Sequence, residues 1–204
     1  MRISWLRHAC FMVEAQGYQV VLDPFDEVTG CPDTDVEADA VLCSHEHHDH
    51  NHRAGVKLRA GKESPFTVEV VESFHDEKEG ALRGSNKIHI LRAEGLKVAH
   101  LGDLGHQLSD EQAAALEGCD ALMIPVGGTY TVDGDGAAAI VEKVRPRVVI
   151  PMHYRGEGFG FPVIDTVEPF LEHFPAEKVC RLPESFMELT AETPEQVAVL
   201  AFPV

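Results

Sequence analysis

The stretch Ser44-His45-Glu46-His47-His48-Asp49-His50-Asn51-His52 determines how the rest of this sequence is interpreted. Five of its nine residues are histidine and one is aspartate. Such a composition is unexpected both for a buried strand, which favours Val and Ile, and for a loop, which favours small polar residues. Imidazole is the commonest protein ligand of transition metals, and carboxylate often accompanies it. The stretch therefore predicts a metal site.

The position and spacing of this stretch support that prediction. The apolar residues 40–43 precede it and predict a buried strand, so the cluster begins where a rigid element ends. His45 and His47 point the same way in an extended backbone, and Asp49 and His50 follow a turn, so one segment can supply two adjacent metals. A solvated His-rich tract that binds metal adventitiously is the alternative, but such tracts lack a preceding strand and an internal Asp.

The pattern His45-x-His47-x-Asp49-His50 resembles the HxHxDH signature of the metallo-β-lactamase superfamily. The resemblance extends over nearly the whole chain and is greatest to a small, compact branch that includes ascorbate-phosphate lactonase-like hydrolases. It implies an α/β fold, a four-layer αββα sandwich formed by residues 1–204 as a single domain. The metal site would then lie at the edge between two mixed sheets.

The resemblance also implies ligands for two divalent transition-metal ions. One ion would be held by His45, His47 and His75. The other would be held by Asp49, His50 and His153, and the two ions would be bridged by Asp103. Seven ligands leave open positions for water and substrate, as in catalytic sites. Zinc suits the nitrogen-rich set best, and manganese and iron also fit, because ligand type alone does not fix the metal.

The ligands outside the signature follow predicted strands. His75 comes after the strand predicted over residues 66–71, whereas its rivals His89 and His100 lie inside strand patterns, where ligation is less convenient. Asp103 follows another strand, and its two oxygens can span ions about 3.5–4 Å apart. His153 follows a strand in the order that the family requires.

Four residues have supporting or unassigned roles. Asp23, at the end of a strand, could simply cap the turn, but the resemblance implies that it supports the metal loop by accepting a hydrogen bond from a ligand and does not bind metal itself. His8 lies on the same face of the first predicted strand as Cys10, and the sequence leaves open whether it borders the pocket or is structural. The sequence also leaves open whether His106 lines the pocket or supports a metal ligand. His173 falls in a predicted helix and is expected at the surface.

The implied reaction is hydrolysis of a small ester, lactone, amide or phosphoester. A water bridging two cations loses a proton near neutral pH and attacks as hydroxide, with Asp49 and His50 as the catalytic candidates. Four loop residues are candidates for substrate binding: Tyr130, Thr131, Tyr154 and Arg155. An arginine would favour an anionic substrate, although it could equally pair with a surface carboxylate.

Two other functions use the same fold. A di-iron redox protein is disfavoured because no flavin-binding region is recognised in 204 residues. A non-catalytic metal-binding domain is disfavoured because all seven ligands are present.

The composition is that of a soluble globular protein, with 44% apolar and 25% charged residues. The net charge of −17 disfavours nucleic acid as a partner, so a small-molecule substrate is expected and a homo-oligomer is left open. No apolar run approaches the ~20 residues of a membrane span, and no signal peptide is recognised. Five scattered cysteines without a CxxC pattern fit free thiols in the cytoplasm.

The remaining pattern predicts alternating strands and helices. Residues 3–14 and 18–23 predict a hairpin around Gln16-Gly17, and residues 26–39 predict a surface loop. Ser109 and Gln112 form a capping box for a helix ending near Glu117. Further elements are expected at these places: strands over 87–91, 96–101, 120–125, 147–152, 178–182, 185–190 and 196–202, and helices over 136–144 and from about 165.

Overall fold

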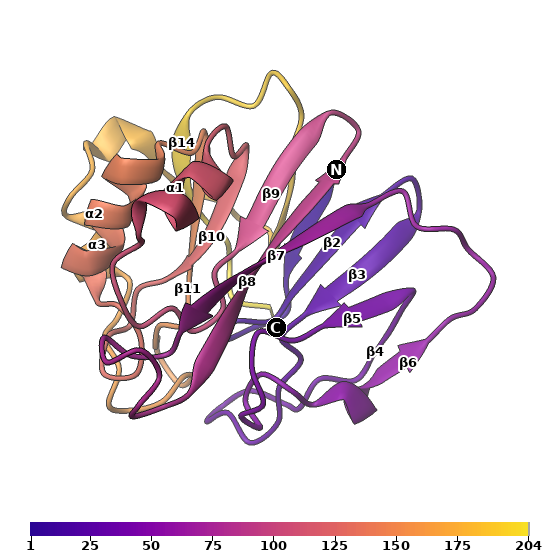
Figure 1. Ribbon diagram of the computed structural model, residues 1–204, viewed down its shortest axis with the longest axis horizontal. Coiled ribbons are helices and arrows are strands. Elements are labelled where there is room, and N and C mark those ends of the chain that lie inside the picture. The colour runs from indigo at the N-terminus through magenta and orange to yellow at the C-terminus, as the bar shows by residue number, and fades with distance from the viewer. Residues whose placement is uncertain (204) are drawn as a thin grey trace.

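The first third of the chain forms most of a five-stranded sheet in the computed structural model, which describes residues 1–203. Alternate residues of its first strands are buried, because successive side chains of a strand point to opposite faces. The strand order is β13-β1-β2-β3-β5 (Figure 1), with these bounds: β13 (Phe186–Glu188), β1 (Arg2–Trp5), β2 (Phe11–Ala15), β3 (Tyr18–Leu22) and β5 (Ala40–Leu42).

The predicted hairpin is confirmed, but its first strand is interrupted. β2 and β3 pair antiparallel on either side of Gln16-Gly17, whose positive φ angles suit a tight two-residue turn. Between β1 and β2 the chain makes a second turn, with φ of 92° at Arg7 and 50° at His8. An extended strand requires negative φ, so the prediction that His8 and Cys10 share a face of one continuous strand is wrong.

The second sheet has seven strands in the order β12-β14-β11-β10-β9-β8-β7. Its strands are β12 (Val179–Arg181), β14 (Gln196–Val199), β11 (Val148–Met152), β10 (Ala121–Pro125), β9 (Leu96–His100), β8 (Ser85–Ala93) and β7 (Thr67–Phe74). Every residue of β10 and β11 is buried, and both strands have parallel neighbours. Parallel strands covered on both faces read as continuous apolar runs, which explains why the sequence predicted them clearly.

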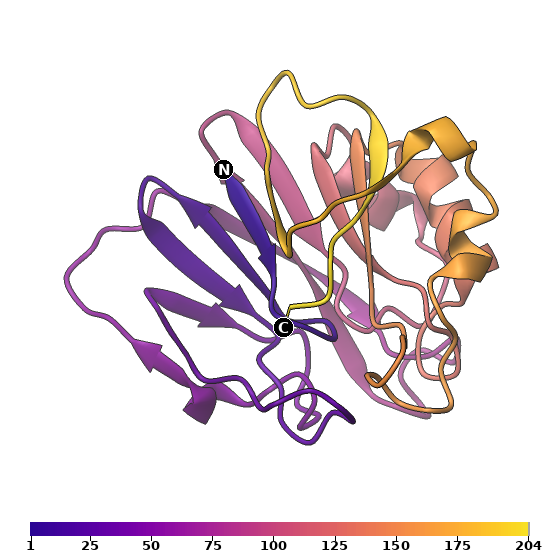
Figure 2. The ribbon, with the colours of Figure 1, turned by 180° about the vertical axis from the view of Figure 1, so that it is seen from behind.

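Three α-helices cover the outer face of this sheet (Figures 1 and 2): α1 (Asp110–Leu116), α2 (Gly134–Val144) and α3 (Glu168–Leu171). The predicted capping box of α1 is present, since Ser109 Oγ accepts a hydrogen bond from the Gln112 amide and the Gln112 side chain accepts one from the Ser109 amide. Among residues 1–203, no helix is long and apolar enough to cross a membrane.

The predicted α/β fold with two sheets face to face is confirmed, and the layer outside the five-stranded sheet is largely non-helical. There, β4 (Val36–Ala38) pairs in parallel with β6 (Val56–Leu58), and a 3-10 helix spans Arg53–Gly55. Residues 53–65 have no helical periodicity, which explains why no α-helix forms in this part of the described chain. β4 lies within the predicted loop 26–39, and the sequence pattern missed it.

Each sheet contributes to a core. The larger core lies between the sheets and under the helices, and it includes the buried side chains of Trp5 and Phe11. A smaller core, with Val21 and Phe25, lies between the five-stranded sheet and the β4–β6 pair. Because Val21 and its neighbour Leu22 point to opposite faces, β3 contributes to both cores.

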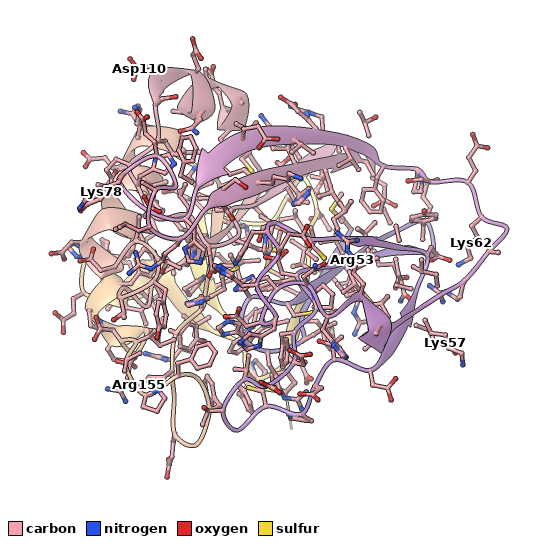
Figure 3. All side chains as sticks on the ribbon, turned by 60° about the horizontal axis from the view of Figure 1, so that its bottom comes forward. Arg53, Lys57, Lys62, Lys78, Asp110 and Arg155 are labelled. Carbon is pink, nitrogen blue, oxygen red and sulfur yellow. The ribbon has the colours of Figure 1, made fainter. Side chains whose placement is uncertain are left out.

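Five strands of the two sheets end at the same edge of the sandwich. β3, β5, β7, β9 and β11 all run toward the lower edge in Figure 1, which Figure 3 brings forward. The residues that follow them include Asp23, His45, His75, Asp103 and His153. The fold therefore gathers residues that are far apart in the sequence at one place.

Candidate metal centre

A first group of three histidines comes from two strand ends. His45 and His47 follow β5, and His75 follows β7. One ring nitrogen of each lies within 4.8 Å of those of the other two. His45 and His75 are buried, while His47 is exposed toward solvent. The structure thus brings together the three residues that were predicted to hold one ion.

A second group contains the residues that were predicted to hold the other ion. Ligand atoms of Asp49, His50 and His153 lie within 4.8 Å of one another, and His8 joins the same group. His50 and His153 are fully buried, and the Asp49 side chain is 15% exposed. The sequence had assigned no role to His8.

Asp103 lies between the two groups. Its Oδ2 is 3.1 Å from Nε2 of His75 and 3.9 Å from Nε2 of His45, both in the first group. Its Oδ1 is 3.1 Å from Nε2 of His50, and Oδ2 is 3.4 Å from Nε2 of His153, both in the second group. One carboxylate therefore contacts both groups, which is the geometry that a bridging ligand needs.

The donor atoms at the centre are suited to cations. Several buried atoms have no aligned hydrogen-bond partner: both ring nitrogens of His8 and His153, Nε2 of His45 and His50, and Oδ1 of Asp103. A buried polar atom without a partner costs about 1–3 kcal/mol, so a cluster of them requires compensation. Nitrogen and carboxylate lone pairs that converge in this way fit divalent transition-metal ions.

Asp23 orients two of the histidines, as predicted for it. Its Oδ2 lies 2.8 Å from His50 Nδ1, so it can accept that N–H and leave Nε2 facing Asp103. The carboxylate also accepts the Ser44 amide and hydroxyl at 2.6 Å each. Ser44 Oγ lies 2.9 Å from His45 Nδ1. The Asp23 carboxylate thus fixes the start of the histidine-rich loop.

The backbone of Asp103 is held by a buried asparagine. Asn86 Oδ1 accepts the Asp103 amide at 3.0 Å, and Asn86 Nδ2 donates to the Leu101 carbonyl at 2.9 Å. Gly102 has φ of +56°, and a Cβ there would lie 2.4 Å from Ser44 Cβ. Only glycine lets the strand carrying Asp103 approach the histidine-rich loop this closely.

The electrostatics favour the protonation states that metal binding requires at His45 and Asp103, but not at His50. Burial lowers the pKa of His45 to about 3, so its ring is neutral near pH 7. Burial also disfavours charge on Asp103, but His153 and His50 prevail and lower the pKa of this carboxyl well below its usual range. For His50, burial is outweighed by Asp103 and Asp23, which raise its pKa well above 6.5. An ion placed here would displace that proton.

The histidines His89, His100, His106 and His173 lie outside the two groups. His89 and His100 sit in β8 and β9, and His100 is saturated by a backbone carbonyl at Nε2 (2.8 Å) and a backbone amide at Nδ1 (3.1 Å). This placement agrees with the preference for His75. His106 accepts the amide of the last residue of β7, so it supports the loop. His173 is at the surface, 2.8 Å from a carboxylate of α2.

A cavity of about 620 Å³ lies over the two groups. Asp49, His75 and Asp103 line it together with Arg83, Tyr130 and Phe161. Tyr130 was predicted to contact substrate, and its placement agrees with that role. Thr131 was predicted as well, but it does not line this cavity, and its hydroxyl donates to a neighbouring backbone carbonyl at 3.0 Å.

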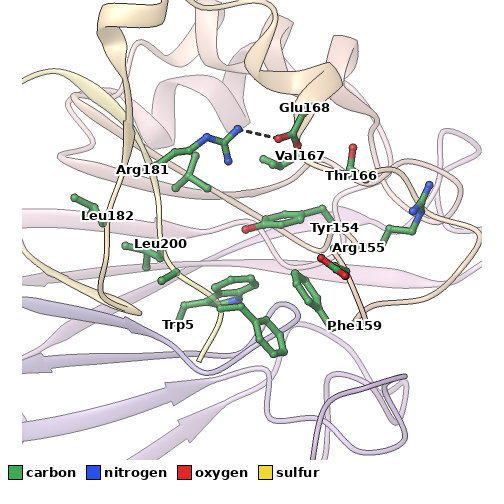
Figure 4. A pocket seen from close by; sticks show the side chains of 15 residues that line it. Trp5, Tyr154, Arg155, Phe159, Thr166, Val167, Glu168, Arg181, Leu182 and Leu200 are labelled. Atoms are coloured by element: carbon green, nitrogen blue, oxygen red, sulfur yellow. Dashed lines mark hydrogen bonds and ion pairs between the residues drawn. The ribbon is translucent and has the colours of Figure 1, made fainter. Parts of the chain in front are cut away.

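Tyr154 and Arg155 line a different cavity, of about 670 Å³, together with Trp5 and Phe159 (Figure 4). His153 has φ of +53°, so the chain turns away from the centre immediately after it. Arg155 Nε donates to a backbone carbonyl at 2.7 Å. The prediction that these two residues hold substrate at the metal centre has no support from this placement.

Arg83 is a cavity residue that the sequence reasoning missed. The Asp76 carboxylate accepts four backbone amides of the following loop, including that of Arg83 at 2.7 Å. This loop carries the Arg83 side chain to the cavity, where Nη2 donates to the Thr129 carbonyl at 3.0 Å. An aspartate followed by Gly80 and Gly84 was the available signal for such an ordered loop.

Comparison with known proteins gives a consistent set of similarities. Residues 2–153, which include both groups and Asp103, match the family model of the β-lactamase superfamily domain. A UPF0173 metal-dependent hydrolase of Carboxydothermus hydrogenoformans is 30% identical over 193 residues, covering 76% of this chain and 84% of that protein.

Two solved structures have the same fold. One is described as a proposed Zn-dependent hydrolase of the metallo-β-lactamase superfamily from Thermotoga maritima. It is 34% identical, with a TM-score of 0.76 over 98% of this chain and 97% of that chain. A proposed metal-dependent hydrolase from Parabacteroides distasonis is 19% identical, with a TM-score of 0.63 over 86% of this chain and 88% of that chain, and it supports the fold alone.

The contact at Gly102 yields a prediction about stability. We expect Gly102→Ala to lower the free energy of unfolding by about 2–4 kcal/mol, because the new Cβ both overpacks the site and disfavours the positive φ. Gly95→Ala is the matched control, since Gly95 has φ of +74° with nothing within 4 Å of its Cβ position, and it should cost only about 1 kcal/mol. Urea unfolding of metal-free protein would measure both, and equal effects would contradict the proposed close approach.

Proposed function

This chain belongs to the β-lactamase superfamily, and on that premise we propose that it is a metal-dependent hydrolase with a dinuclear centre. The observation that carries the proposal is the position of Asp103, within 3.9 Å of histidines from both groups. One ion would be held by His45, His47 and His75, the other by Asp49, His50 and His153, with Asp103 shared. The relatives described as metal-dependent hydrolases support the reaction class.

The ions and the side chains would divide the chemistry between them. When bound, the two ions would lower the pKa of a shared water and polarise a carbonyl or phosphoryl oxygen of the substrate. Asp49 belongs to the second group and also lines the cavity, so its carboxylate can orient the attacking water and pass on the proton that this water loses. Asp23 keeps His50 oriented, and Asp103 offsets part of the positive charge.

Zinc is the ion that we propose for the three-histidine group. Its preference for nitrogen ligands matches His45, His47 and His75. The similar protein from Thermotoga maritima is described as zinc-dependent, which supports the same choice. Manganese and iron fit the second group, where carboxylates accompany the histidines.

We place an anionic group of the substrate at Arg83. Arg83 lines the cavity over the centre, and its guanidinium carbon lies 5.9 Å from the Tyr130 ring centroid. Within residues 1–203 its side chain forms no salt bridge, and the one hydrogen bond of that side chain goes to the Thr129 carbonyl. A small ester, lactone, amide or phosphoester with a carboxylate or phosphate could therefore bind its scissile bond at the ions and its charge at Arg83.

The first prediction from this proposal concerns metal content. We expect about two transition-metal ions per chain by elemental analysis of the purified protein. His47→Ala should weaken metal binding and abolish hydrolysis, because it removes one of three ligands from the first group. His173→Ala changes a surface histidine outside both groups and should alter neither property. Active protein with at most one ion, or equal effects of the two substitutions, would contradict the dinuclear assignment.

The second prediction concerns the charge on Asp103. Asp103→Asn keeps the size of the side chain but removes the charge that offsets two dications. We expect loss of about one ion per chain and a fall in turnover of at least ~100-fold, the scale of a key electrostatic interaction. The same chemical change at the exposed helix residue Asp110 should leave both properties unchanged. An Asp103→Asn variant with two ions and near-normal turnover would make Asp103 a turn residue only.

The third prediction concerns Arg83. With an anionic substrate, Arg83→Gln should raise KM roughly 10- to 100-fold, since a hydrogen bond to a charged group contributes about 1.5–3 kcal/mol. Arg155→Gln is the control, because Arg155 lines the other cavity and also donates to a backbone carbonyl. An uncharged analogue of the same substrate should be hydrolysed equally by the parent and both variants. An equal loss with charged and uncharged substrates would remove Arg83 as the anion-binding residue.

A further inference from the structure

His8 is a buried histidine at the centre that none of the assigned ligand roles includes. It is 2% exposed, and its Nε2 lies 3.5 Å from Asp49 Oδ2. Its ring centroid is 4.2 Å from that of His153 and 5.3 Å from that of His50. One of its ring nitrogens lies within 4.8 Å of the ligand atoms of all three residues. The imidazole thus faces the second group directly.

The ring of His8 lacks the contacts that a structural histidine makes. Neither Nδ1 nor Nε2 has a hydrogen-bond partner among the described residues. His100 is also fully buried and lies three residues before Asp103 in the sequence. Both of its ring nitrogens form hydrogen bonds to the backbone. A buried imidazole that fills space alone would forfeit the solvation of two polar atoms. His8 therefore needs a ligand that neither the protein core nor a backbone group supplies.

The backbone around His8 is built to present this ring. The His8 carbonyl accepts the Trp5 indole N–H at 2.9 Å and the His153 amide at 3.3 Å. Arg7, His8 and His153 all have positive φ, at 92°, 50° and 53°. Such conformations are unfavourable for residues other than glycine, and they persist where the surrounding structure imposes them, often at functional sites. Two strained turns that are about 145 residues apart in the sequence thus meet at one pair of histidines.

We propose that His8 is an eighth protein ligand, binding the ion held by Asp49, His50 and His153. The inference rests on the proposed dinuclear centre. Five protein groups would then be available to that ion, counting Asp103. The first group would offer three histidines and Asp103. Because a larger donor set with two carboxylates suits manganese or iron better than zinc, the two positions would differ in metal preference.

The experiment compares metal binding by the parent, His8→Gln and His89→Gln. His89 is the matched control, because it is 3% exposed with an unpaired Nδ1 but lies outside the ligand groups. Each protein is titrated with Co²⁺ against a competing chelator while its visible absorption is recorded. His8→Gln should raise the dissociation constant of one ion at least ~10-fold and change its absorption, because a ligand has been removed. His89→Gln should match the parent in both measurements.

A second measurement needs no substitution and is independent of any effect on folding. The parent is loaded with an NMR-active cadmium isotope after labelling its histidines with ¹⁵N. Ligation gives a one-bond metal–nitrogen coupling at a ring nitrogen of His8, and no coupling appears at His89.

The outcomes separate this inference from the proposed function. If His8→Gln retains both dissociation constants and the absorption of the parent, or if His8 shows no coupling while His50 and His153 do, His8 is not a ligand and the dinuclear centre stands. If the parent binds fewer than two ions, the dinuclear centre itself is wrong and the inference falls with it.

Discussion

The close contact between one carboxylate and two groups of buried histidines is the constraint on which the rest of the structure depends. Asp103 lies within 3.9 Å of four imidazoles that follow three different strands of both sheets. Burying so many polar atoms is unfavourable unless each is paired or binds a cation. The surrounding network compensates in part: Asp23 holds His50 and Ser44, and Asn86 holds the backbone of Asp103. Nε2 of His45, His50 and His153 has no aligned hydrogen-bond partner and lies within 3.9 Å of the Asp103 carboxylate.

The fold supplies this centre by placing strand ends, not by packing alone. The two sheets bury a common core, and their strands deliver the loops that carry the candidate ligands to one edge. Gly102 allows the loops after β5 and β9 to touch, since any larger residue would collide with Ser44. Rigid strands beneath short loops are a favourable arrangement for chemistry, because ligand positions are fixed before the substrate arrives.

The turn that carries His8 is hydrogen-bonded to a residue of the second cavity, Trp5. Trp5 and Tyr154 form part of the wall of the second cavity, with ring centroids 5.5 Å apart, and Trp5 also binds the carbonyl of His8. The Trp5 side chain therefore supports the backbone of His8, whose ring faces the candidate metal centre. Arg83 belongs to the other face of the centre, where an independent loop ordered by Asp76 brings it to the first cavity.

By itself the sequence determined the strand before the histidine-rich loop, although this strand, β5, is half-buried and not buried as predicted. The resemblance to a family implied the α/β fold and the ligand set, and the residue pattern itself indicated the His and Asp residues at strand ends. These signals are local, since an apolar run followed by His or Asp marks a strand end whatever the rest of the chain does. Only the tertiary structure decided the positions of His8, Arg83, Tyr154 and Arg155 relative to the two cavities and the candidate centre. Positive φ at His8 turns its ring inward, and positive φ at His153 turns the next two residues away. Neither angle is readable from residue type, because contacts between distant segments impose it on residues that would otherwise avoid it.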